Sequence, residues 1–299
     1  MVLRHHALVG RLFAALGFLA LSALAAPASA QSCDRACLGG LITQYVDALV
    51  AHDPAKLPLA AADVRYTEDS QDRKLGEGLW KSVTARTAFR HDYLDTTKQV
   101  AASHLLLMEG SNHIMYSVLL HVKDRKIGGI ETLVQRVTPD GRWQPTELGG
   151  PIRGMNDAVP AGKKMSRADM IRTALTYTEG LRVGSFTDGK TPFAPGIYRV
   201  ENGVITAGPG CGRPDCDMYA QRIMLHPSIV AKVAAVDEEA GTVLLWMNFG
   251  YTDSYGAGNA LVTFEAFKVW GGEIHSILAF FRPLPLATPR YWPSSDPLP

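Results

Sequence analysis

The chain has 299 residues, of which 46% are hydrophobic and 20% charged, and its 30 basic and 29 acidic side chains give a formal charge of +1. This length suits two domains of ordinary size. No block of like charges stands out, so the composition gives no electrostatic reason to expect nucleic acid or an anionic membrane as a partner.

Residues 1–30 have the pattern of a secretory signal peptide. Arg4 and Arg11 supply a positive region, residues 12–24 a short apolar segment, and residues 28–30 a small-residue cleavage site. A membrane span needs about 20 apolar residues, which makes a retained anchor the weaker alternative. We therefore expect a periplasmic or secreted protein whose mature chain begins near Gln31.

All four cysteines follow the predicted cleavage site, as the pairs Cys33 and Cys37, and Cys211 and Cys216. In an exported protein an even number of cysteines favours disulfides over a metal–thiolate site. Neither spacing is CxxC, so we expect no metal. Three pairings are possible; the turn-like segment CGRPDC favours two local bridges, but the sequence does not fix the connectivity.

The first half begins with an amphipathic helix, in which Leu38, Leu41, Ile42, Tyr45 and Leu49 follow the i, i+3, i+4, i+7 spacing. Proline-containing turns come next. Apolar runs separated by turn residues then predict strands. These strands lie at residues 64–68, 105–108, 114–122 and 130–137.

A linker and a second, similar half follow. Residues 139–164 are rich in Gly and Pro and lack periodicity, so we interpret them as a linker, with any edge strand at 142–146 belonging to the first half. A second helix is predicted from Ser166, which forms a capping-box-like start with Asp169. A helix followed by hairpin-linked strands predicts an α+β fold with antiparallel sheets. The strands of this half are predicted at residues 197–201, 229–236, 243–249, 261–270 and 274–281.

The two halves align with each other. KIGGIETLV (126–134) matches EIHSILAFF (273–281) without a gap, and SVLLHV matches FEAFKV in the same register. Earlier in each half, YVDALVAHD matches YTEGLRVGS and VRYTE matches IYRVE. A repeat this long indicates a duplicated domain rather than a solenoid unit. The predicted organisation is a signal peptide, a first domain, a linker, a second domain and a tail, at residues 1–30, 31–150, 151–165, 166–292 and 293–299.

The chain also resembles secreted two-copy SnoaL-like proteins of the nuclear transport factor 2-like class, a family labelled as a domain of unknown function. The segments that carry the resemblance are VRYTED, LGEGLW and IGGIETLVQR, then RVENGVITAG, VDEEAGTVL and FKVWGGEIHSI. The resemblance implies two tandem cone-shaped domains, each with N-terminal helices packed in a curved antiparallel sheet around an apolar pocket. Relatives of this fold include lyases, isomerases and plain binding domains, so the resemblance does not identify a reaction. A fused pair can replace the homodimer common for this fold, and we expect either a monomer with a pseudo-dimeric domain pair or a homodimer.

Two carboxylates are the leading catalytic candidates, because apolar pocket walls shift the pKa of an acid that performs general acid–base chemistry. Glu265 and Glu131 each share strand parity with apolar residues. Their counterparts in the other half are Val118 and Leu278, so each half carries an acid where the other tolerates an aliphatic side chain. The alternative is that each acid faces solvent or pairs with a nearby base.

Tyr66 and Glu68 are the catalytic candidates of the first half, since they share parity at the end of a strand that lines the pocket in this architecture. Glu201 occupies the place of Glu68 in the second half. Because both halves hold the acid at the same place, the position favours a shared structural role, such as capping turn amides. His113, near the start of its strand, can reach a pocket mouth, whereas His121 on the same polar parity is expected to face solvent.

Five further residues are candidates for substrate binding: Trp80, Tyr219, Arg222, Trp246 and His275. The aromatic residues would wall a pocket against an aromatic ligand, although bulky aromatic side chains are more often plain core. The resemblance implies that Arg222 binds a carboxylate or an enolate oxygen.

No GxSxG, P-loop or HExxH motif and no dinucleotide fingerprint after a strand occurs in the sequence, so we expect no cofactor. The resulting hypothesis is an exported, cofactor-independent lyase or isomerase that acts by general acid–base chemistry on a small hydrophobic or aromatic molecule. The alternative is a non-catalytic periplasmic ligand-binding or interaction protein. The sequence identifies neither the substrate nor the active half.

Overall fold

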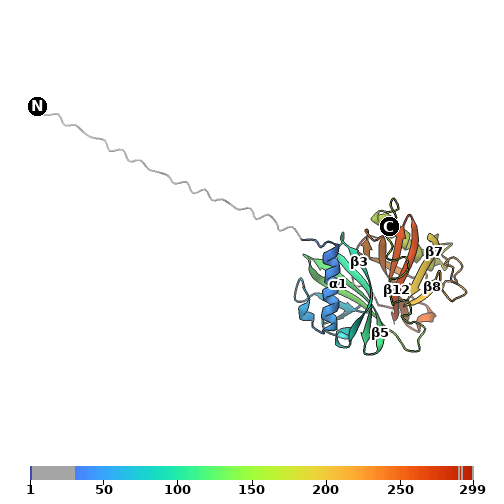
Figure 1. Ribbon diagram of the computed structural model, residues 1–299, viewed down its shortest axis with the longest axis horizontal. Coiled ribbons are helices and arrows are strands. Elements are labelled where there is room, and N and C mark those ends of the chain that lie inside the picture. Colours follow the sequence, from blue (N-terminus) through green and yellow to red (C-terminus); the bar gives the residue numbers. More distant parts are fainter. Residues whose placement is uncertain (2–30, 289, 291, 298–299) are drawn as a thin grey trace. The chain divides into compact units, whose positions relative to one another are not determined.

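The computed structural model describes Met1, residues 31–288, Arg290 and residues 292–297. Apart from Met1, the predicted signal peptide lies outside the described residues. Residues Gln31–Pro299 form one compact unit, whose described part contains two α-helices and two six-stranded sheets (Figure 1). This confirms the predicted α+β class, while the domain boundaries within the unit remain a prediction. No helix of the described residues is long and apolar enough to cross a membrane.

The first half consists of α1 (Arg35–Val50), η1 (Pro54–Lys56), β1 (Arg65–Glu68), β2 (Gln71–Arg73), η2 (Gly78–Lys81), β3 (Ala85–Asp95), β4 (Val100–Glu109), β5 (Asn112–Lys123) and β6 (Lys126–Arg136). Asp34 caps α1 by accepting the backbone N–H of Cys37. The strand order is β2-β1-β6-β5-β4-β3, in which only β1 and β6 pair in parallel.

The second half repeats this plan with α2 (Arg167–Val183), β7 (Phe193–Glu201), β8 (Val204–Ala207), β9 (Val230–Asp237), β10 (Thr242–Asn248), η3 (Asp253–Tyr255), β11 (Asn259–Trp270) and β12 (Glu273–Pro285). Ser166 caps α2 by accepting the backbone N–H of Asp169, as predicted, and Gly184 ends the helix in the left-handed conformation. The strand order is β8-β7-β12-β11-β10-β9, and β7 and β12 are the parallel pair.

The strand register confirms that the second half repeats the first. Val118 pairs with Thr132 across β5 and β6, and their aligned counterparts, Glu265 and Ala279, pair across β11 and β12. The parallel pairs β1–β6 and β7–β12 keep the same correspondence. The internal alignment therefore identifies structurally equivalent positions, and each half can serve as a control for the other.

Three strands, β2, β3 and β8, are absent from the sequence-based prediction, and the edge strand proposed at 142–146 does not form. β3 shows no clear apolar periodicity because polar side chains on this strand bond to α1. Arg90, for example, donates to the carbonyl oxygen of Gly39 at 2.9 Å and to Oγ1 of Thr43 at 2.8 Å. Where charged side chains of a strand face a helix, the strand lacks the alternation of apolar and polar residues by which strands are predicted.

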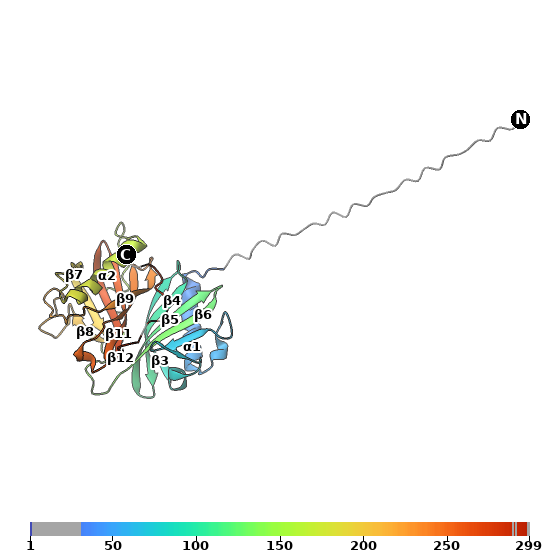
Figure 2. The ribbon, with the colours of Figure 1, turned by 180° about the vertical axis from the view of Figure 1, so that it is seen from behind.

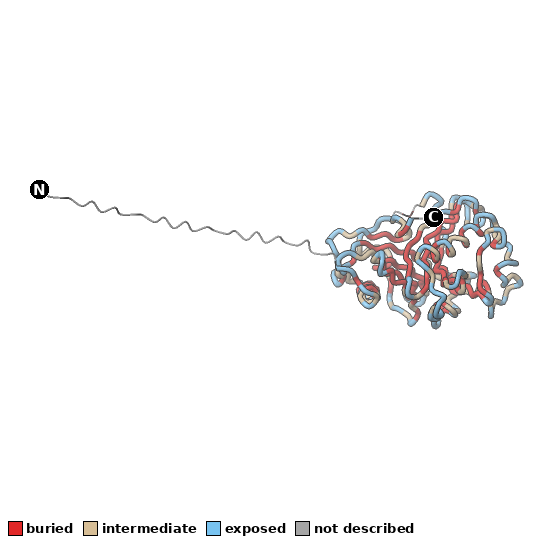
Figure 3. The backbone as a smooth tube through the Cα atoms, turned by 90° about the horizontal axis from the view of Figure 1, so that it is seen from above, coloured by how far each residue is buried: buried red, intermediate tan, exposed pale blue. Residues whose placement is uncertain are grey.

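The strands of both sheets are buried along much of their length (Figure 3). Each sheet buries both of its faces. One face packs on the helix of its own half; we call it the helix face, and its cores surround Tyr45 in the first half and Tyr177 in the second. The other, the inter-sheet face, packs against the other half through a third core that includes Met115, Leu244 and Phe264. A strand buried on both faces carries apolar residues at both parities, so parity alone does not tell which face holds a pocket.

The two sheets lie side by side (Figures 1 and 2) and are joined by two equivalent sets of polar contacts. Arg35, at the start of α1, pairs with Asp237 at the end of β9. Arg167, at the start of α2, pairs in the same way with Asp95 at the end of β3. Asp237 also accepts a backbone N–H of β3 at 2.9 Å, and Asp95 one of β9 at 2.9 Å. Such reciprocal contacts are the geometry of a twofold dimer interface.

Both disulfides are local. Cys33 bonds to Cys37 at the start of α1, and Cys211 bonds to Cys216 in the loop after β8. This is the pairing that the turn-like second segment favoured, and no cysteine of the described chain is free.

Candidate functional site

A cavity of about 350 Å³ opens on the helix face of the second half. Its walls come from α2, β7, β11 and β12 and from the loops around Trp143, Gln221 and Tyr255. This volume lies at the low end of the range for small-molecule sites, which are concave and mostly apolar with a few convergent polar groups.

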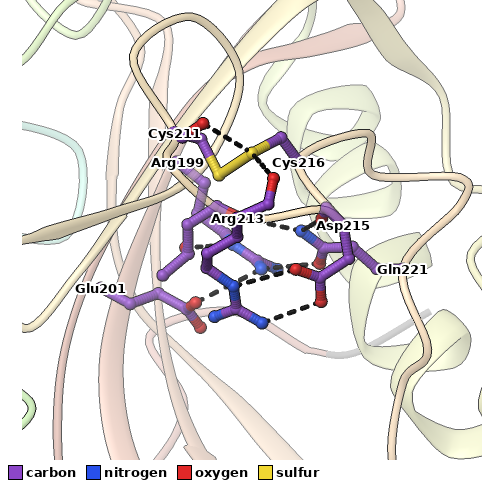
Figure 4. The surroundings of a disulfide bond; sticks show 8 residues. Arg199, Glu201, Cys211, Arg213, Asp215, Cys216 and Gln221 are labelled. Atoms are coloured by element: carbon purple, nitrogen blue, oxygen red, sulfur yellow. Dashed lines mark hydrogen bonds and ion pairs between the residues drawn. A yellow bond between two sulfur atoms is a disulfide. The ribbon is translucent and has the colours of Figure 1, made fainter.

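One wall is the loop after β8, which the disulfide between Cys211 and Cys216 closes (Figure 4). This loop and the segment after it supply Arg213, Asp215 and Gln221 to the cavity. Arg213 donates to both carboxylate oxygens of Asp215, at 2.9 and 2.8 Å. The bridge therefore holds the charged wall of the cavity in place.

Arg199, on β7, is the centre of the polar wall and has only 7% of its surface exposed. Its guanidinium donates to Thr206 Oγ1 at 2.9 Å, to the Tyr177 hydroxyl at 3.0 Å and to Gln221 Oε1 at 2.7 Å. Glu201 lies 3.3 Å from the same guanidinium. Arg199 thus places a fixed positive charge, and the hydroxyl of Tyr177, beside the cavity.

Glu265, the candidate carboxylate of β11, lies next to this network. Only 2% of its surface is exposed, and within the described chain its Oε1 has no hydrogen-bond partner. Burial raises the pKa of Glu265 to about 8, with a further contribution from Glu201, while Arg199 and the Tyr177 hydroxyl act in the opposite direction. Glu265 is not on the cavity wall, but Tyr177 and Arg199, which interact with it, are.

A histidine and several aromatic rings form the apolar side of the cavity. His226 is buried and stacks on Tyr255, with ring centroids 6.1 Å apart. Its Nδ1 has no hydrogen-bond partner in the described part of the chain, and burial lowers the pKa of His226. Trp143 packs edge-on against Phe281 at 5.0 Å. The cavity therefore joins an aromatic wall to a charged one.

In the first half, the candidates Tyr66 and Glu68 are bonded to each other. Tyr66 donates to Glu68 Oε2 at 2.9 Å, and the same oxygen accepts the backbone N–H of Leu79 at 2.8 Å. Glu68 therefore caps a turn amide, which was the structural alternative for this position. The aligned Glu201 lies beside Arg199, which replaces Tyr66 in the second half.

Aromatic side chains fill the helix face of the first half. Trp80 packs edge-on against Tyr45 at 5.5 Å, and Tyr45 shares a hydrogen bond of 2.7 Å with Tyr116. All three side chains are buried. Val118 occupies the position that Glu265 has in the second half. These differences lead us to place the candidate site in the second half.

Glu131 lies on the inter-sheet face. Arg290 donates to both of its carboxylate oxygens at 2.8 Å, and His121 Nε2 lies 3.7 Å away. Burial acts to raise the pKa of Glu131, but Arg290 and His121 outweigh it, so the pKa is lowered. Trp292 stacks on His121 with centroids 4.0 Å apart. The sequence predicts that His121 faces solvent, but Trp292 covers it and only 25% of its side chain is exposed.

Of the remaining candidates, only Arg222 lines the cavity, with an exposed side chain. Trp246 lies on the inter-sheet face, and His275 stacks on a neighbouring tryptophan of β11. Tyr219 lines a separate groove, and His113 is half-buried at the start of β5. Among the described residues, no group of three or more His, Cys, Asp or Glu side chains is placed to hold a metal ion.

Sequence reasoning misses Tyr177, Arg199, Gln221 and His226 as site residues. Arg199 carries a signal, since it lies on the buried parity of the apolar strand IYRVE, at the position of Tyr66. A buried arginine requires acceptors and therefore a polar environment inside the fold. Tyr177 is indistinguishable from core on its helix stripe, and Gln221 and His226 lie in a loop without periodicity.

Comparisons with known proteins give one family model and a distant solved structure. A family model described as a domain of unknown function, DUF8021, matches residues 163–281, which contain most of the cavity. Among solved structures, a "putative ketosteroid isomerase" from Kribbella flavida DSM 17836 matches at 17% identity with a TM-score of 0.27, over 42% of this chain and 93% of that one. No curated protein matches.

Proposed function

We propose that the chain is an exported protein of two tandem nuclear transport factor 2-like domains, and that the second domain is a lyase or isomerase for a small hydrophobic or aromatic substrate. The observation that carries the proposal is the buried carboxyl of Glu265, one oxygen of which has no hydrogen-bond partner among the described residues and whose pKa is raised to about 8. An acid with a pKa near the working pH is suited to both accept and return a proton.

The proposed chemistry is a proton transfer through Tyr177. A substrate with a C–H bond next to a carbonyl enters the cavity, and the ionised Glu265 takes that proton by way of the Tyr177 hydroxyl, which gives up its own proton as it receives the new one. The electron pair of the C–H bond forms the carbon–carbon double bond of an enolate, and the π pair of the carbonyl moves onto its oxygen. The positive charge of Arg199 favours this enolate. Return of the proton to another carbon completes an isomerisation, and loss of a β-substituent completes an elimination.

Export is supported by the signal-like residues 1–30 and by two disulfides, which persist in oxidising compartments. In this account the first domain is a scaffold, because Tyr66 and Glu68 bond to each other and Trp80 fills its helix face.

The test is hydrogen–deuterium exchange of small aryl ketones, such as 1-indanone and 1-tetralone, followed by NMR in D₂O. We expect the protein to accelerate exchange and Glu265→Gln to lower the acceleration by about 100-fold or more. Glu179→Gln, an exposed acid on α2 that pairs with Arg182, should leave it unchanged. Acceleration that survives in Glu265→Gln would remove Glu265 from the mechanism.

Binding without turnover is the second candidate function. The observation that favours it is that Glu265 is absent from the cavity wall. A ligand that binds equally to the wild type and to Glu265→Gln, with no exchange in either, would support this alternative.

A further inference from the structure

The side chains that line the cavity include more arginines than carboxylates. Among the described lining residues there are four arginines and two carboxylates. Glu201 pairs with Arg199, and Asp215 with Arg213 (Figure 4). Both acids are therefore already in ion pairs with arginines of the same wall.

Arg142 and Arg222 are the two arginines left over. Within the described chain neither has a carboxylate partner. Arg142 lies over the ring of Trp143, 4.5 Å from its centroid, and both arginine side chains are exposed. They are solvated in the free protein, so an incoming anion meets little desolvation cost on their side. A guanidinium also matches the planar fork of a carboxylate, to which it can donate two parallel hydrogen bonds.

The rest of the cavity selects for shape. Tyr255 and Phe281 line it with aromatic rings, and burial lowers the pKa of His226 beside them, which disfavours a charged ring there. A cavity of about 350 Å³ leaves room for one small ring system. Aromatic walls favour a flat, apolar ligand body.

From this arrangement we infer that the ligand of the cavity is a small flat molecule with one carboxylate, whose anionic group binds Arg142 and Arg222 while its apolar body lies against the aromatic wall. This assignment rests on the proposed function for the location of the site and names the substrate class. The reacting part of the ligand then lies toward Tyr177 and Arg199, away from the carboxylate.

The test compares trans-cinnamate with its neutral isostere cinnamamide by isothermal titration calorimetry. We expect cinnamate to bind at least 10-fold more tightly, with a preference that falls as salt rises. In the double variant Arg142→Gln and Arg222→Gln the preference should fall below about 2-fold, while the affinity for cinnamamide stays the same. The double lysine variant, which keeps both charges, should retain most of the preference.

Arg172→Gln is the matched control, because Arg172 is an exposed arginine on α2 that pairs with Asp169 and does not line the cavity. It should leave both affinities unchanged. Equal binding of cinnamate and cinnamamide, a preference that survives the double glutamine variant, or no binding of either probe would each overturn the inference. Glu265→Gln separates the two proposals, since it should abolish ketone exchange and keep the preference for cinnamate.

Discussion

At the scale of single residues, Glu131 and Glu265 are both buried acids with an aliphatic counterpart in the other half, yet they differ in their partners. Glu131 receives two hydrogen bonds from Arg290 on the inter-sheet face. Glu265 lies on the helix face beside a cavity, and one of its oxygens has no partner in the part of the chain that the structure describes. A fully paired acid stabilises the fold, whereas an unpaired acid whose pKa lies near neutral pH can accept and donate protons in a reaction.

The pair of Glu131 and Arg290 makes a stability prediction. Glu131→Gln or Arg290→Gln alone should lower the free energy of unfolding by about 3–5 kcal/mol, because each leaves an uncompensated buried charge. The double variant Glu131→Leu with Arg290→Met should come close to the wild type, since Leu278 already fills the equivalent site. Urea denaturation measures both. A single variant as stable as the wild type would contradict the buried pair.

Glu265 makes the stability of the protein depend on pH. Because its pKa is raised from 4.5 to about 8, Glu265 contributes stability that is fully present below pH 4.5 and is lost as pH rises through 8. At about 1.4 kcal/mol for each pKa unit, the loss is on the order of 3 kcal/mol by pH 7. Glu265→Gln should lack this loss, so its stability relative to the wild type should rise between pH 4.5 and 8. A difference that stays constant with pH would show that Glu265 is ionised in the native state.

At the scale of elements, the loop closed by Cys211 and Cys216 connects stability to the site. Replacing both cysteines by serine should cost about 2 kcal/mol of stability and weaken ligand binding, because the loop carries Arg213 and Asp215. The matched control is the same replacement of Cys33 and Cys37, which lie at the start of α1. This replacement should lower stability, but it should leave ligand binding unchanged under conditions in which the protein is fully folded. If both replacements changed ligand binding equally, the loop closed by Cys211 and Cys216 would have no specific role in the site.

The helices and strands also show how much of the fold could be predicted from the sequence. The two helices and the central strands carry strong periodicity, and the internal alignment predicts which strands are equivalent. β3 escapes prediction because polar residues such as Arg90 bond to α1. The face on which Glu131 lies is equally hidden, since packing of one sheet on the other makes both parities apolar. Arg290, its partner, is distant in sequence, and no local pattern joins the two.

At the scale of the whole molecule, the reciprocal contacts of Asp95 and Asp237 and the shared inter-sheet core make the two halves one cooperative structure. We therefore expect a single calorimetric transition with equal calorimetric and van't Hoff enthalpies. Asp95→Asn and Asp237→Asn should lower its midpoint by similar amounts, because the two sites are equivalent. Two resolved transitions in the wild type would show that the halves unfold independently.

Duplication also explains how the helix face can be filled by side chains in one half and hollowed by a cavity in the other. Once two copies share a core, only one needs a cavity on its helix face, and the other can fill that face with side chains such as Trp80. The substitutions of Arg199 for Tyr66 and of Glu265 for Val118 have turned the equivalent space of the second half polar.

The carboxyl of Glu265 is the group on which the proposed chemistry depends, and its titration can be measured directly. The experiment is a ¹³C NMR titration of protein labelled at the glutamate side-chain carboxyl, with the Glu265 resonance assigned by its loss in Glu265→Gln. The account predicts a midpoint near pH 8. A midpoint at the ordinary glutamate value, near 4.3, would contradict it.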